Sequence, residues 1–214
     1  MQLPIEKDFS PSKIVCVGRN YAEHAAELGN EVPSEPLIFL KAPSSLIFNG
    51  RSIVIPLQSQ QVEHEGELAI IIGESCRRLT DLDDLSEIVL GYTCLNDVTA
   101  RDLQRRDIQF TRAKSFDTFC PIGPHIETEL DTADIQVMTL VNGDVRQSGR
   151  TSQMVFSIDF LIRYISNIMT LNRGDVIATG TPSGVAKLEP GDICGVRIEG
   201  IGELTNPVVN FDHK

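Results

Sequence analysis

Short apolar runs that end at turn-forming residues are the feature that most limits how this chain can fold. The runs at residues 13–17 and 68–72 are rich in β-branched side chains, and each is followed directly by glycine. Such runs are typical of β-strands, because a helix needs about ten or more residues. The longest, at residues 68–72, has five apolar residues, whereas a membrane-spanning helix needs about 20. We therefore expect a strand-rich protein that does not enter a membrane.

The rest of the chain continues this pattern and includes one strong hairpin signal. Residues 134–141 and 144–148 flank Asn142-Gly143, a pair that tolerates the positive φ angles of a type I′ turn. Strands and helices do not alternate regularly, which disfavours a doubly wound sheet or a TIM barrel. Further strands are expected at residues 36–41, 52–56, 175–179, 192–199 and 202–209.

Helical patterns are few. Residues 157–170 carry apolar side chains at steps of three and four, which predicts a helix with one apolar face; these side chains are Ile158, Leu161, Ile165 and Ile168. A weaker helix is expected at residues 82–89, with Asp81 as its cap. A short helix is expected at residues 20–28, with Asn20 as N-cap and Glu23 three residues later.

Length and charge limit the possible functions. The 214 residues suit one full-size domain. We expect a single catalytic domain over residues 1–214, with a short N-terminal appendage at about residues 1–12. The net charge is −11, and the most basic segment, residues 101–106, contains Asp102 and is followed by Asp107. That balance opposes nucleic-acid binding, which needs a basic surface, but it allows a small anionic substrate.

The cysteines and the N-terminal sequence indicate in which cellular compartment the protein is expected. The five cysteines are widely spaced and form no Cys-x-x-Cys pair, which opposes a disulfide framework or a thiolate zinc site. Residues 1–10 contain no apolar segment of the kind found in secretion signals. We expect a cytoplasmic protein whose cysteines serve as small core residues.

The most informative stretch is VEHEGELA at residues 62–69, which leads directly into an apolar strand. Residues two apart on a strand point to the same face, so Glu65 and Glu67 project together, with side-chain origins ~7 Å apart. Two carboxylates at the start of a buried strand repel each other, and a bound cation would offset that cost. A solvated edge-strand face and a catalytic carboxylate pair are the alternatives. A zinc-protease motif is excluded, because Leu68 stands where a second histidine is needed.

Asp97 follows two apolar residues at the expected end of another strand. Its carboxylate would make a third oxygen ligand beside Glu65 and Glu67. Three carboxylates without cysteine suit Mg²⁺ or Mn²⁺ better than Zn²⁺. The alternative is that Asp97 caps a helix at residues 99–104.

His24 and Glu27 are three residues apart on the short helix expected at residues 20–28. At that spacing the carboxylate can orient the imidazole and raise its basicity, as a general base acting on water requires. The alternative is an exposed histidine–glutamate pair without a role in chemistry.

Other polar side chains extend this set. Lys114 lies beside apolar residues and is either a cation placed near an anionic intermediate or an exposed lysine. Arg101 and Gln104 share one helix face, which either borders a site or faces solvent. The glycines of residues 179–184 allow close backbone approach to a ligand, although the segment also fits an ordinary turn.

The order of these segments along the chain resembles that of one enzyme family. The segments are GRNYAEH at residues 18–24, HEGEL at 64–68, NDVTARDLQ at 96–104, AKSFD at 113–117 and TGTPSGV at 179–185. From about residue 13 to residue 208, the chain is similar to the fumarylacetoacetate hydrolase family. It resembles especially the short members that act on acylpyruvates or oxaloacetate.

The resemblance implies an α+β, strand-rich fold: a mixed β-roll of the family's C-terminal domain type with a few short helices, usually a homodimer. The family's ligands for Mg²⁺ or Mn²⁺ match Glu65, Glu67 and Asp97. Its water-activating pair matches His24 and Glu27, and its cation near the developing enolate matches Lys114. The positions where relatives contact substrate match Arg19, Arg101, Gln104 and Thr181.

The implied activity is metal-dependent cleavage of a C–C bond in an acylpyruvate-type 2,4-dioxo acid, such as fumarylpyruvate or acetylpyruvate, to pyruvate and a carboxylic acid. The same metal–enolate chemistry supports an oxaloacetate decarboxylase, or an isomerase or hydratase of a dienoic 2-oxo acid. In each case the expected partner is a small anionic 2-oxo acid. A metal-stabilised binding protein without turnover is the alternative outside enzymes.

Overall fold

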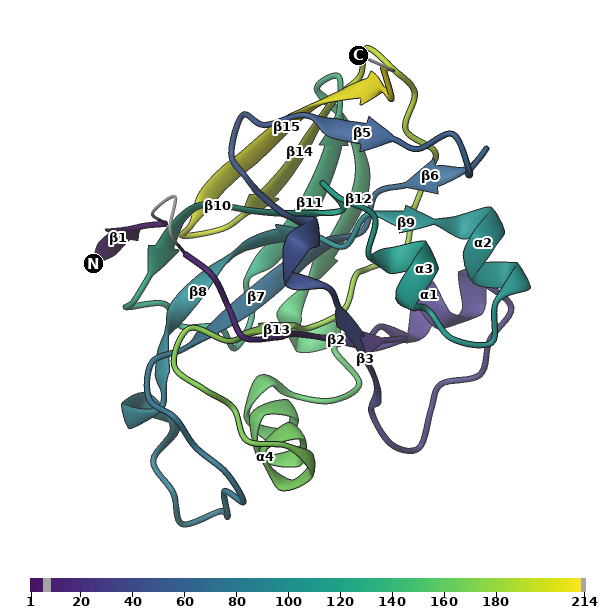
Figure 1. Cartoon of the computed structure of the whole chain (residues 1–214). Coiled ribbons are helices and arrows are strands. Elements are labelled where there is room, and N and C mark those ends of the chain that lie inside the picture. The colour runs from purple at the N-terminus through teal and green to yellow at the C-terminus, as the bar shows by residue number, and fades with distance from the viewer. Residues whose placement is uncertain (6–8, 213–214) are drawn as a thin grey trace.

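The computed structural model describes residues 1–5 and 9–212 and shows mixed sheets with few helices. This confirms the strand-rich fold predicted from the sequence. The largest sheet in the described part has eight strands, ordered β1-β10-β8-β7-β13-β2-β3 with β4 beside β10 (Figure 1). The pairs β13–β2 and β10–β4 are parallel. The strands are β1 (Gln2–Pro4), β2 (Ile14–Gly18), β3 (Leu37–Lys41), β4 (Leu46–Phe48), β7 (Gly66–Ile72), β8 (Val89–Asn96), β10 (Cys120–Glu127) and β13 (Val176–Ala178).

A second sheet has five strands in the order β12-β11-β14-β15-β5, and only its β15–β5 pair is parallel. Its members are β5 (Ile53–Ile55), β11 (Gln136–Val141), β12 (Asp144–Arg150), β14 (Ile193–Ile198) and β15 (Gly202–Asn210). A small two-stranded sheet joins β6 (Val62–Glu63) to β9 (Thr99–Ala100).

The helices are short and unevenly placed. In Figure 1, α1, α2 and α3 gather on one side of the molecule, and α4 lies apart from them. The α-helices are α1 (Ala22–Glu27), α2 (Arg101–Arg106), α3 (Thr111–Lys114) and α4 (Ile158–Ile168). The 3₁₀ helices are η1 (Pro43–Ser45), η2 (Leu85–Glu87) and η3 (Thr151–Gln153).

Strand β7 lies inside the large sheet, and all seven of its residues are buried. Its alternate side chains face two apolar clusters. Leu68 and Ile70 pack in the cluster shared with the second sheet and α4. Ala69 and Ile71 face the cluster on the other side of the sheet. Glu67 belongs to this second series, so its carboxylate lies on the face turned away from the second sheet.

The helix predicted at residues 157–170 and the hairpin at residues 134–148 are both confirmed. Helix α4 begins after Ser157, whose hydroxyl accepts a hydrogen bond from the Phe160 N–H at 3.3 Å. Of its predicted apolar face, Ile158, Leu161 and Ile165 are buried in the main cluster, whereas Ile168 at the last turn is exposed. In the hairpin turn, Asn142 and Gly143 have φ angles of 55° and 87°, as the Asn-Gly pair predicts.

The helix predicted at residues 82–89 is wrong. The chain forms only η2 there, and Val89 already begins β8. Asp84, not Asp81, accepts the capping hydrogen bond, from the Ser86 N–H at 2.9 Å. Leu85, Ile88 and Val89 pack against the core from a turn and a strand start, whereas Leu82 is exposed.

The predicted cap of the first helix is also wrong. Helix α1 begins at Ala22, and its N-cap residue Tyr21 makes no side-chain capping hydrogen bond. The buried Asn20 amide donates to the carbonyl oxygens of Thr179 at 2.8 Å and Phe156 at 3.1 Å, and its oxygen accepts from the Phe156 N–H at 2.8 Å. Asn20 therefore joins the start of α1 to two distant segments, at Phe156 and Thr179. Its side chain satisfies buried backbone groups there instead of capping α1.

Part of the predicted appendage at residues 1–12 belongs to the large sheet. Strand β1 pairs antiparallel with β10, with Gln2 opposite Glu127, whereas residues 6–8 lie outside the described residues. Further along, the Ser12 hydroxyl donates to the buried Asp175 carboxylate at 2.6 Å. Among the residues that are described, no helix combines the length and apolar character needed to cross a membrane.

Replacing Asn20 with alanine tests its cross-linking role. The change leaves the Phe156 N–H and the Thr179 carbonyl without partners in the interior, so the free energy of unfolding should fall by about 2–3 kcal/mol. Urea denaturation measures this loss. Asn210→Ala, at an exposed position on β15, is the matched control and should change stability by less than about 0.5 kcal/mol. Equal effects of the two substitutions would contradict the role.

Candidate active site

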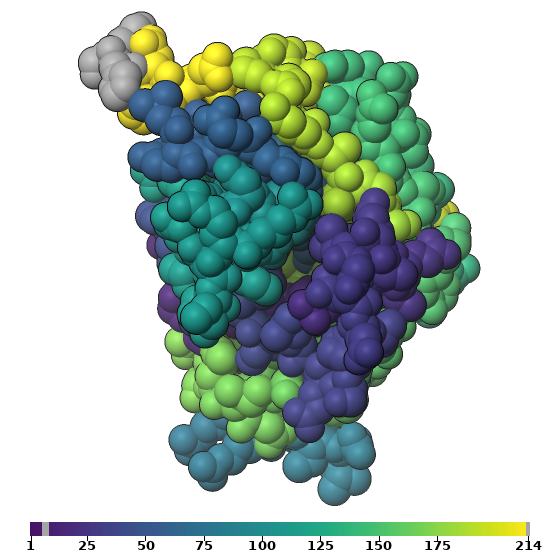
Figure 2. All heavy atoms as spheres, turned by 90° about the vertical axis from the view of Figure 1, so that its right-hand side faces the viewer, coloured from purple at the N-terminus to yellow at the C-terminus, as the bar shows by residue number. Residues whose placement is uncertain are grey.

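A cavity of about 330 Å³ opens between α1 on one side and α2 and α3 on the other. Figure 2 shows the hollow between the teal surface that includes α2 and α3 and the purple surface that includes α1. All ten residues predicted for a site line this one cavity: Arg19, His24, Glu27, Glu65, Glu67, Asp97, Arg101, Gln104, Lys114 and Thr181.

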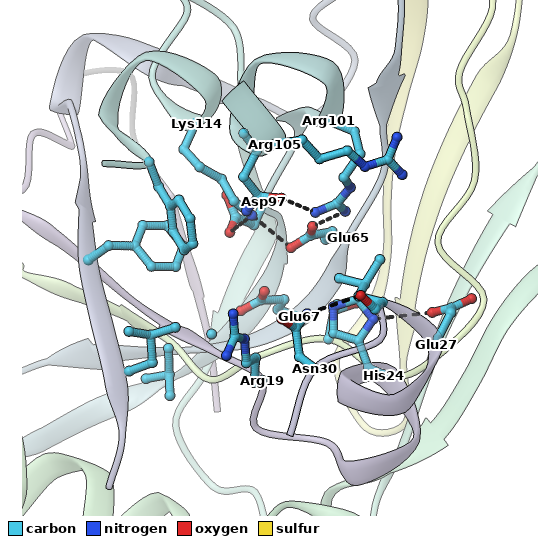
Figure 3. A pocket seen from close by; sticks show the side chains of 18 residues that line it. Arg19, His24, Glu27, Asn30, Glu65, Glu67, Asp97, Arg101, Arg105 and Lys114 are labelled. Atoms are coloured by element: carbon cyan, nitrogen blue, oxygen red, sulfur yellow. Dashed lines mark hydrogen bonds and ion pairs between the residues drawn. The ribbon is translucent and has the colours of Figure 1, made fainter. Parts of the chain in front are cut away.

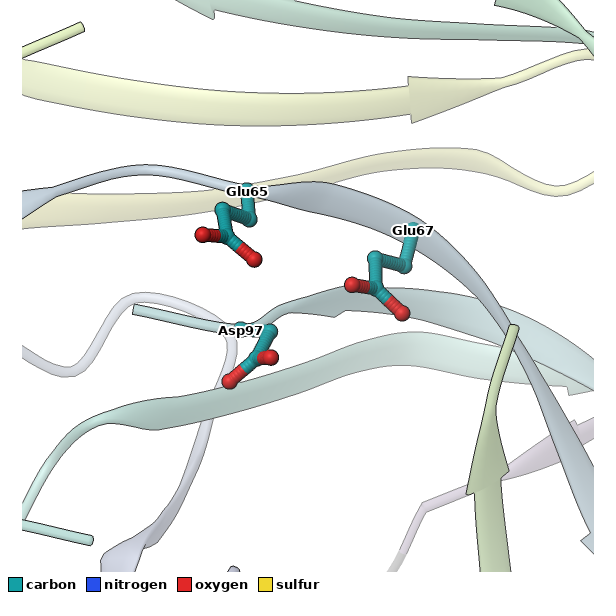
Figure 4. Close-up of side chains that lie close together, drawn as sticks. All are labelled: Glu65, Glu67 and Asp97. Atoms are coloured by element: carbon teal, nitrogen blue, oxygen red, sulfur yellow. The ribbon is translucent and has the colours of Figure 1, made fainter. Parts of the chain in front are cut away.

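Three carboxylates form the centre of the site (Figure 4). Glu65 and Glu67 lie at the start of β7 and Asp97 directly follows β8, and the register Gly66 opposite Asn96 brings these ends together. One oxygen of each carboxylate lies within 4.8 Å of the others, and all three residues are buried. The alternative of a solvated edge strand is therefore wrong.

The alternative that Asp97 caps a helix is also wrong. Helix α2 begins only at Arg101, and its N-cap is Ala100. The Asp97 carboxylate instead accepts hydrogen bonds from the Lys41 Nζ at 2.6 Å and the Lys114 Nζ at 2.6 Å. Asp97 therefore acts within a buried network of charges, not as a local cap.

Buried cations surround the carboxylates. The Lys114 Nζ bridges Asp97 and Glu65, with a distance of 2.8 Å to the Glu65 Oε2. The Arg101 guanidinium donates to Glu65 and, through Nε at 2.7 Å, to Glu63. With all groups ionised, Glu63 and the three central carboxylates exceed Lys41, Lys114 and Arg101 by one negative charge.

The surroundings of Glu65 and Glu67 shift the pKa values of the two carboxyl groups in opposite directions. Burial raises the pKa of Glu65, but the nearby charges of Lys114 and Arg101 outweigh burial and hold that pKa well below its ordinary value. Burial and the charges of Asp97 and Glu65 raise the pKa of Glu67 well above its ordinary value. Glu67 makes no salt bridge within the described part of the chain, and its Oε2 accepts from the Gly180 N–H at 2.7 Å. It is the least compensated member of the cluster.

The donor set fits a hard divalent cation. Three buried carboxylates on two adjacent strand ends, with oxygens close enough to share one ion, match the ligand chemistry of Mg²⁺ and Mn²⁺. The excess negative charge of the network and the uncompensated Glu67 would both be relieved by such an ion. Glu65, Glu67 and Asp97 are the residues that would hold it.

His24 and Glu27 face the cavity from α1 (Figure 3). The His24 side chain is 6% exposed, and its Nδ1 lies 3.2 Å from the Glu27 Oε2. An ionised carboxylate only accepts hydrogen bonds, so Nδ1 carries the proton and Nε2 is the basic nitrogen. Glu27 also accepts from the Gly184 N–H at 3.0 Å. The pair is therefore held against the loop at residues 179–184 and is not an isolated surface pair.

The loop at residues 179–184 supplies backbone donors to the site. Gly180 donates to Glu67 and Gly184 donates to Glu27. Both glycines have φ of 100°, and a Cβ at position 184 would lie 2.2 Å from the Arg146 carbonyl oxygen. The glycines donate backbone N–H groups to the site's own carboxylates, and the predicted close approach to a ligand stays a prediction.

The four residues predicted to contact substrate differ in whether their side chains already have hydrogen-bond partners. Arg19 has a φ of 58°, and its side chain has no hydrogen-bond or ion-pair partner among the described residues. Arg101 is buried, and its Nε, Nη1 and Nη2 are engaged by Glu63, Gln104 and Glu65. Gln104 is thereby held beside Arg101. The Thr181 hydroxyl donates to the Gly66 carbonyl oxygen at 2.9 Å.

Sequence reasoning missed several contributors. Lys41 ends a predicted strand, and its apolar neighbours gave no sign that its Nζ reaches Asp97. Phe39 and Phe110 line the cavity and pack edge to face at 5.5 Å, and Lys114 lies 5.2 Å from the Phe39 ring centre. Arg105, within the basic segment, also lines the cavity. Strand alternation could have placed Phe39 two residues from Lys41 on one face.

Comparison with known proteins identifies relatives over nearly the whole chain. A family model described as fumarylacetoacetate (FAA) hydrolase C-terminal matches residues 13–209. The mitochondrial oxaloacetate decarboxylase of Dictyostelium discoideum is 47% identical over 193 residues, which cover 86% of this chain and 88% of that protein. Oxaloacetate tautomerase YisK of Bacillus subtilis is 44% identical, over 97% of this chain and 72% of its own length.

A solved structure shares the fold. The structure of 5-carboxymethyl-2-hydroxymuconate delta-isomerase from Mycobacterium smegmatis matches with a TM-score of 0.88 at 49% identity. The match covers 95% of this chain and 80% of that one.

Thermal unfolding with Mn²⁺ tests the carboxylate cluster. A cation that binds only the folded state at a concentration about 100 times its Kd adds about 2.7 kcal/mol, which should raise Tm by about 5–10 °C. Glu67→Gln should abolish the rise, and it leaves no buried lysine unpaired. Glu74→Gln, at an exposed position, is the control and should keep the rise. An equal rise in all three proteins would contradict the site.

Proposed function

This chain belongs to the fumarylacetoacetate hydrolase family, and we propose that it converts a small anionic 2-oxo acid through its enol or enolate form. The observation that carries the proposal is the cavity that combines the His24–Glu27 pair, the carboxylate cluster and Lys114. The names of two relatives support it, since decarboxylation and tautomerisation of oxaloacetate both change the bonding at the carbon beside a 2-oxo group.

The specific reaction we propose is hydrolysis of an acylpyruvate-type 2,4-dioxo acid. A paired general base supports this choice, because hydrolysis needs an activated water whereas decarboxylation does not. Water forms a bond from its oxygen to carbon 4 and loses a proton to the His24 Nε2. The bond between carbons 3 and 4 breaks, its electron pair stays on carbon 3 as pyruvate enolate, and the acyl group leaves as a carboxylic acid. The proton held on the His24 Nε2 is returned to carbon 3, which completes pyruvate and regenerates the neutral imidazole.

The remaining side chains stabilise charge. Glu27 holds the His24 ring and offsets the positive charge that develops on it. Lys114 uses two of its three N–H donors on Glu65 and Asp97, and its positive charge lies where an enolate would develop. Arg19, whose guanidinium has no partner among the described residues, is available to a substrate carboxylate. A divalent cation bound by Glu65, Glu67 and Asp97 would supply Lewis-acid stabilisation of the enolate.

Oxaloacetate decarboxylation is the second candidate, and the name of the Dictyostelium relative favours it. That reaction needs the carboxylate cluster and Lys114 but no attacking water. An isomerase of a dienoic 2-oxo acid would use His24 to move a proton between carbons instead, and the isomerase name of the Mycobacterium smegmatis structure supports this interpretation.

Substrate consumption with and without metal distinguishes these reactions. Loss of the enol absorbance of acetylpyruvate or fumarylpyruvate, with one pyruvate formed per substrate, is expected with Mg²⁺ and should stop with excess EDTA. Activity on oxaloacetate alone would replace the hydrolase with the decarboxylase. Metal binding without turnover of either substrate would contradict both and would favour the isomerase or the binding protein.

His24→Ala tests the base. Loss of general-base catalysis should lower the kcat for acylpyruvate hydrolysis by about 10²-fold or more, whereas the rise of Tm with Mn²⁺ should persist because His24 is not among the ligands. His125→Ala, on β10 and outside the cavity lining, is the matched control. If the Mn²⁺ response disappears together with activity, His24 does not have the role proposed.

A further inference from the structure

Gln147 is a buried hub that joins the second sheet to the active site. It lies on β12 with 1% of its surface exposed. Its Oε1 accepts from the Thr139 hydroxyl at 2.7 Å, the Gly66 N–H at 3.0 Å and the His64 Nδ1 at 3.0 Å. Its Nε2 donates to the Thr181 hydroxyl at 2.8 Å and the Pro182 carbonyl oxygen at 2.7 Å.

These partners fix the orientation of the Gln147 amide. The Gly66 N–H can only donate, and the Pro182 carbonyl can only accept. Oε1 must therefore face Gly66, and Nε2 must face Pro182 and Thr181. An amide turned by 180° would place donor against donor and acceptor against acceptor, at a cost of about 1–3 kcal/mol for each buried group.

The fixed amide also fixes the Thr181 hydroxyl. A threonine hydroxyl has one proton and two lone pairs. The proton goes to the Gly66 carbonyl oxygen, which only accepts, and one lone pair receives the Gln147 N–H. Thr181 lines the cavity, and what it has left to offer a ligand is one lone pair.

We propose that Gln147 is a positioning residue that holds the Thr181 hydroxyl as a hydrogen-bond acceptor toward the cavity. A lone pair attracts a neutral O–H and repels a carboxylate oxygen, so this point of the site takes a hydroxyl donor. On the proposed 2-oxo acid chemistry, on which this inference rests, that donor is either the enol hydroxyl of the substrate or the attacking water. Thr181 thus favours the neutral hydroxyl over an anionic oxygen at its position.

The two ends of Gln147 can be tested separately. Gln147→Glu keeps an oxygen to accept from Gly66, Thr139 and His64 but removes both N–H donors. The retained oxygen matters because its partner Gly66 lies between Glu65 and Glu67. Gly66 is packed so closely that a Cβ there would lie 2.1 Å from the Thr139 Oγ1. The substitution should therefore leave the carboxylate cluster in place, while a carboxylate oxygen in the position of Nε2 competes with the Gly66 carbonyl for the Thr181 proton.

The experiment is a double-substitution cycle with Gln147→Glu and Thr181→Val. Each alone should lower kcat/KM by about tenfold, the equivalent of one lost hydrogen bond of about 1.4 kcal/mol. The double variant should be no more than about twofold worse than either single one, because both remove the same acceptor. The Tm rise with Mn²⁺ should persist in Gln147→Glu. Gln153→Glu, an exposed glutamine beyond the same strand that keeps its accepting oxygen, should match the wild type.

The kinetic constants identify the donor. A higher KM in Thr181→Val points to the enol hydroxyl of the substrate, and a lower kcat with unchanged KM points to the water. Thr181→Ser keeps the hydroxyl and should recover most of the activity that Thr181→Val loses. Fully multiplicative losses in the double variant, or wild-type kcat and KM in Thr181→Val, would overturn the proposal, and the Thr181 result holds even if Gln147→Glu does not fold. A wild-type protein inactive on every 2-oxo acid would instead refute the proposed function.

Discussion

Carboxylates buried at adjacent strand ends repel one another, and the packing around them follows from how that repulsion is offset. Glu65 and Asp97 are brought together by the β7–β8 pairing, which the apolar core determines. Three cations then come from three other elements: Lys41 from β3, Arg101 from α2 and Lys114 from α3. Helices as short as α2 and α3 are not stable alone. Breaking a buried ion pair costs several kcal/mol because one charge is left unpaired, so these contacts hold both helices over the cavity.

Local pattern was enough to predict the parts of the site that depend on one strand or one turn. The period of two in β7 placed Glu65 and Glu67 together, and the Asn142-Gly143 pair placed the hairpin that carries Gln147. Contacts between distant segments were not predictable in this way. Nothing near Asn20 shows that its amide reaches Thr179 and Phe156, and nothing near Lys41 shows that it reaches Asp97. The failed helix at residues 82–89 has the same origin, because pairing of Val89 with Ile72 outweighed a weak helical pattern.

The site therefore has two kinds of support. The acidic half is held by the large sheet and its cations, whereas Thr181, Gly180 and Gly184 belong to a loop whose hydrogen bonds run to the other elements. Gly180 donates to Glu67, Gly184 donates to Glu27, and Gln147 of the second sheet holds Thr181. This loop links both sheets and α1, so the relative placement of His24, the carboxylate cluster and Thr181 depends on one short segment of backbone.

The Glu27 carboxylate couples the position of α1 to the orientation of the His24 ring. The same carboxylate accepts from the Gly184 amide and from the His24 Nδ1. A displacement of α1 away from the loop at residues 179–184 would break the contact with Gly184 and shift the carboxylate that orients His24. The His24 imidazole then loses the carboxylate that fixes its orientation. On the proposed chemistry, the general base is therefore oriented only while α1 is held against the loop at residues 179–184.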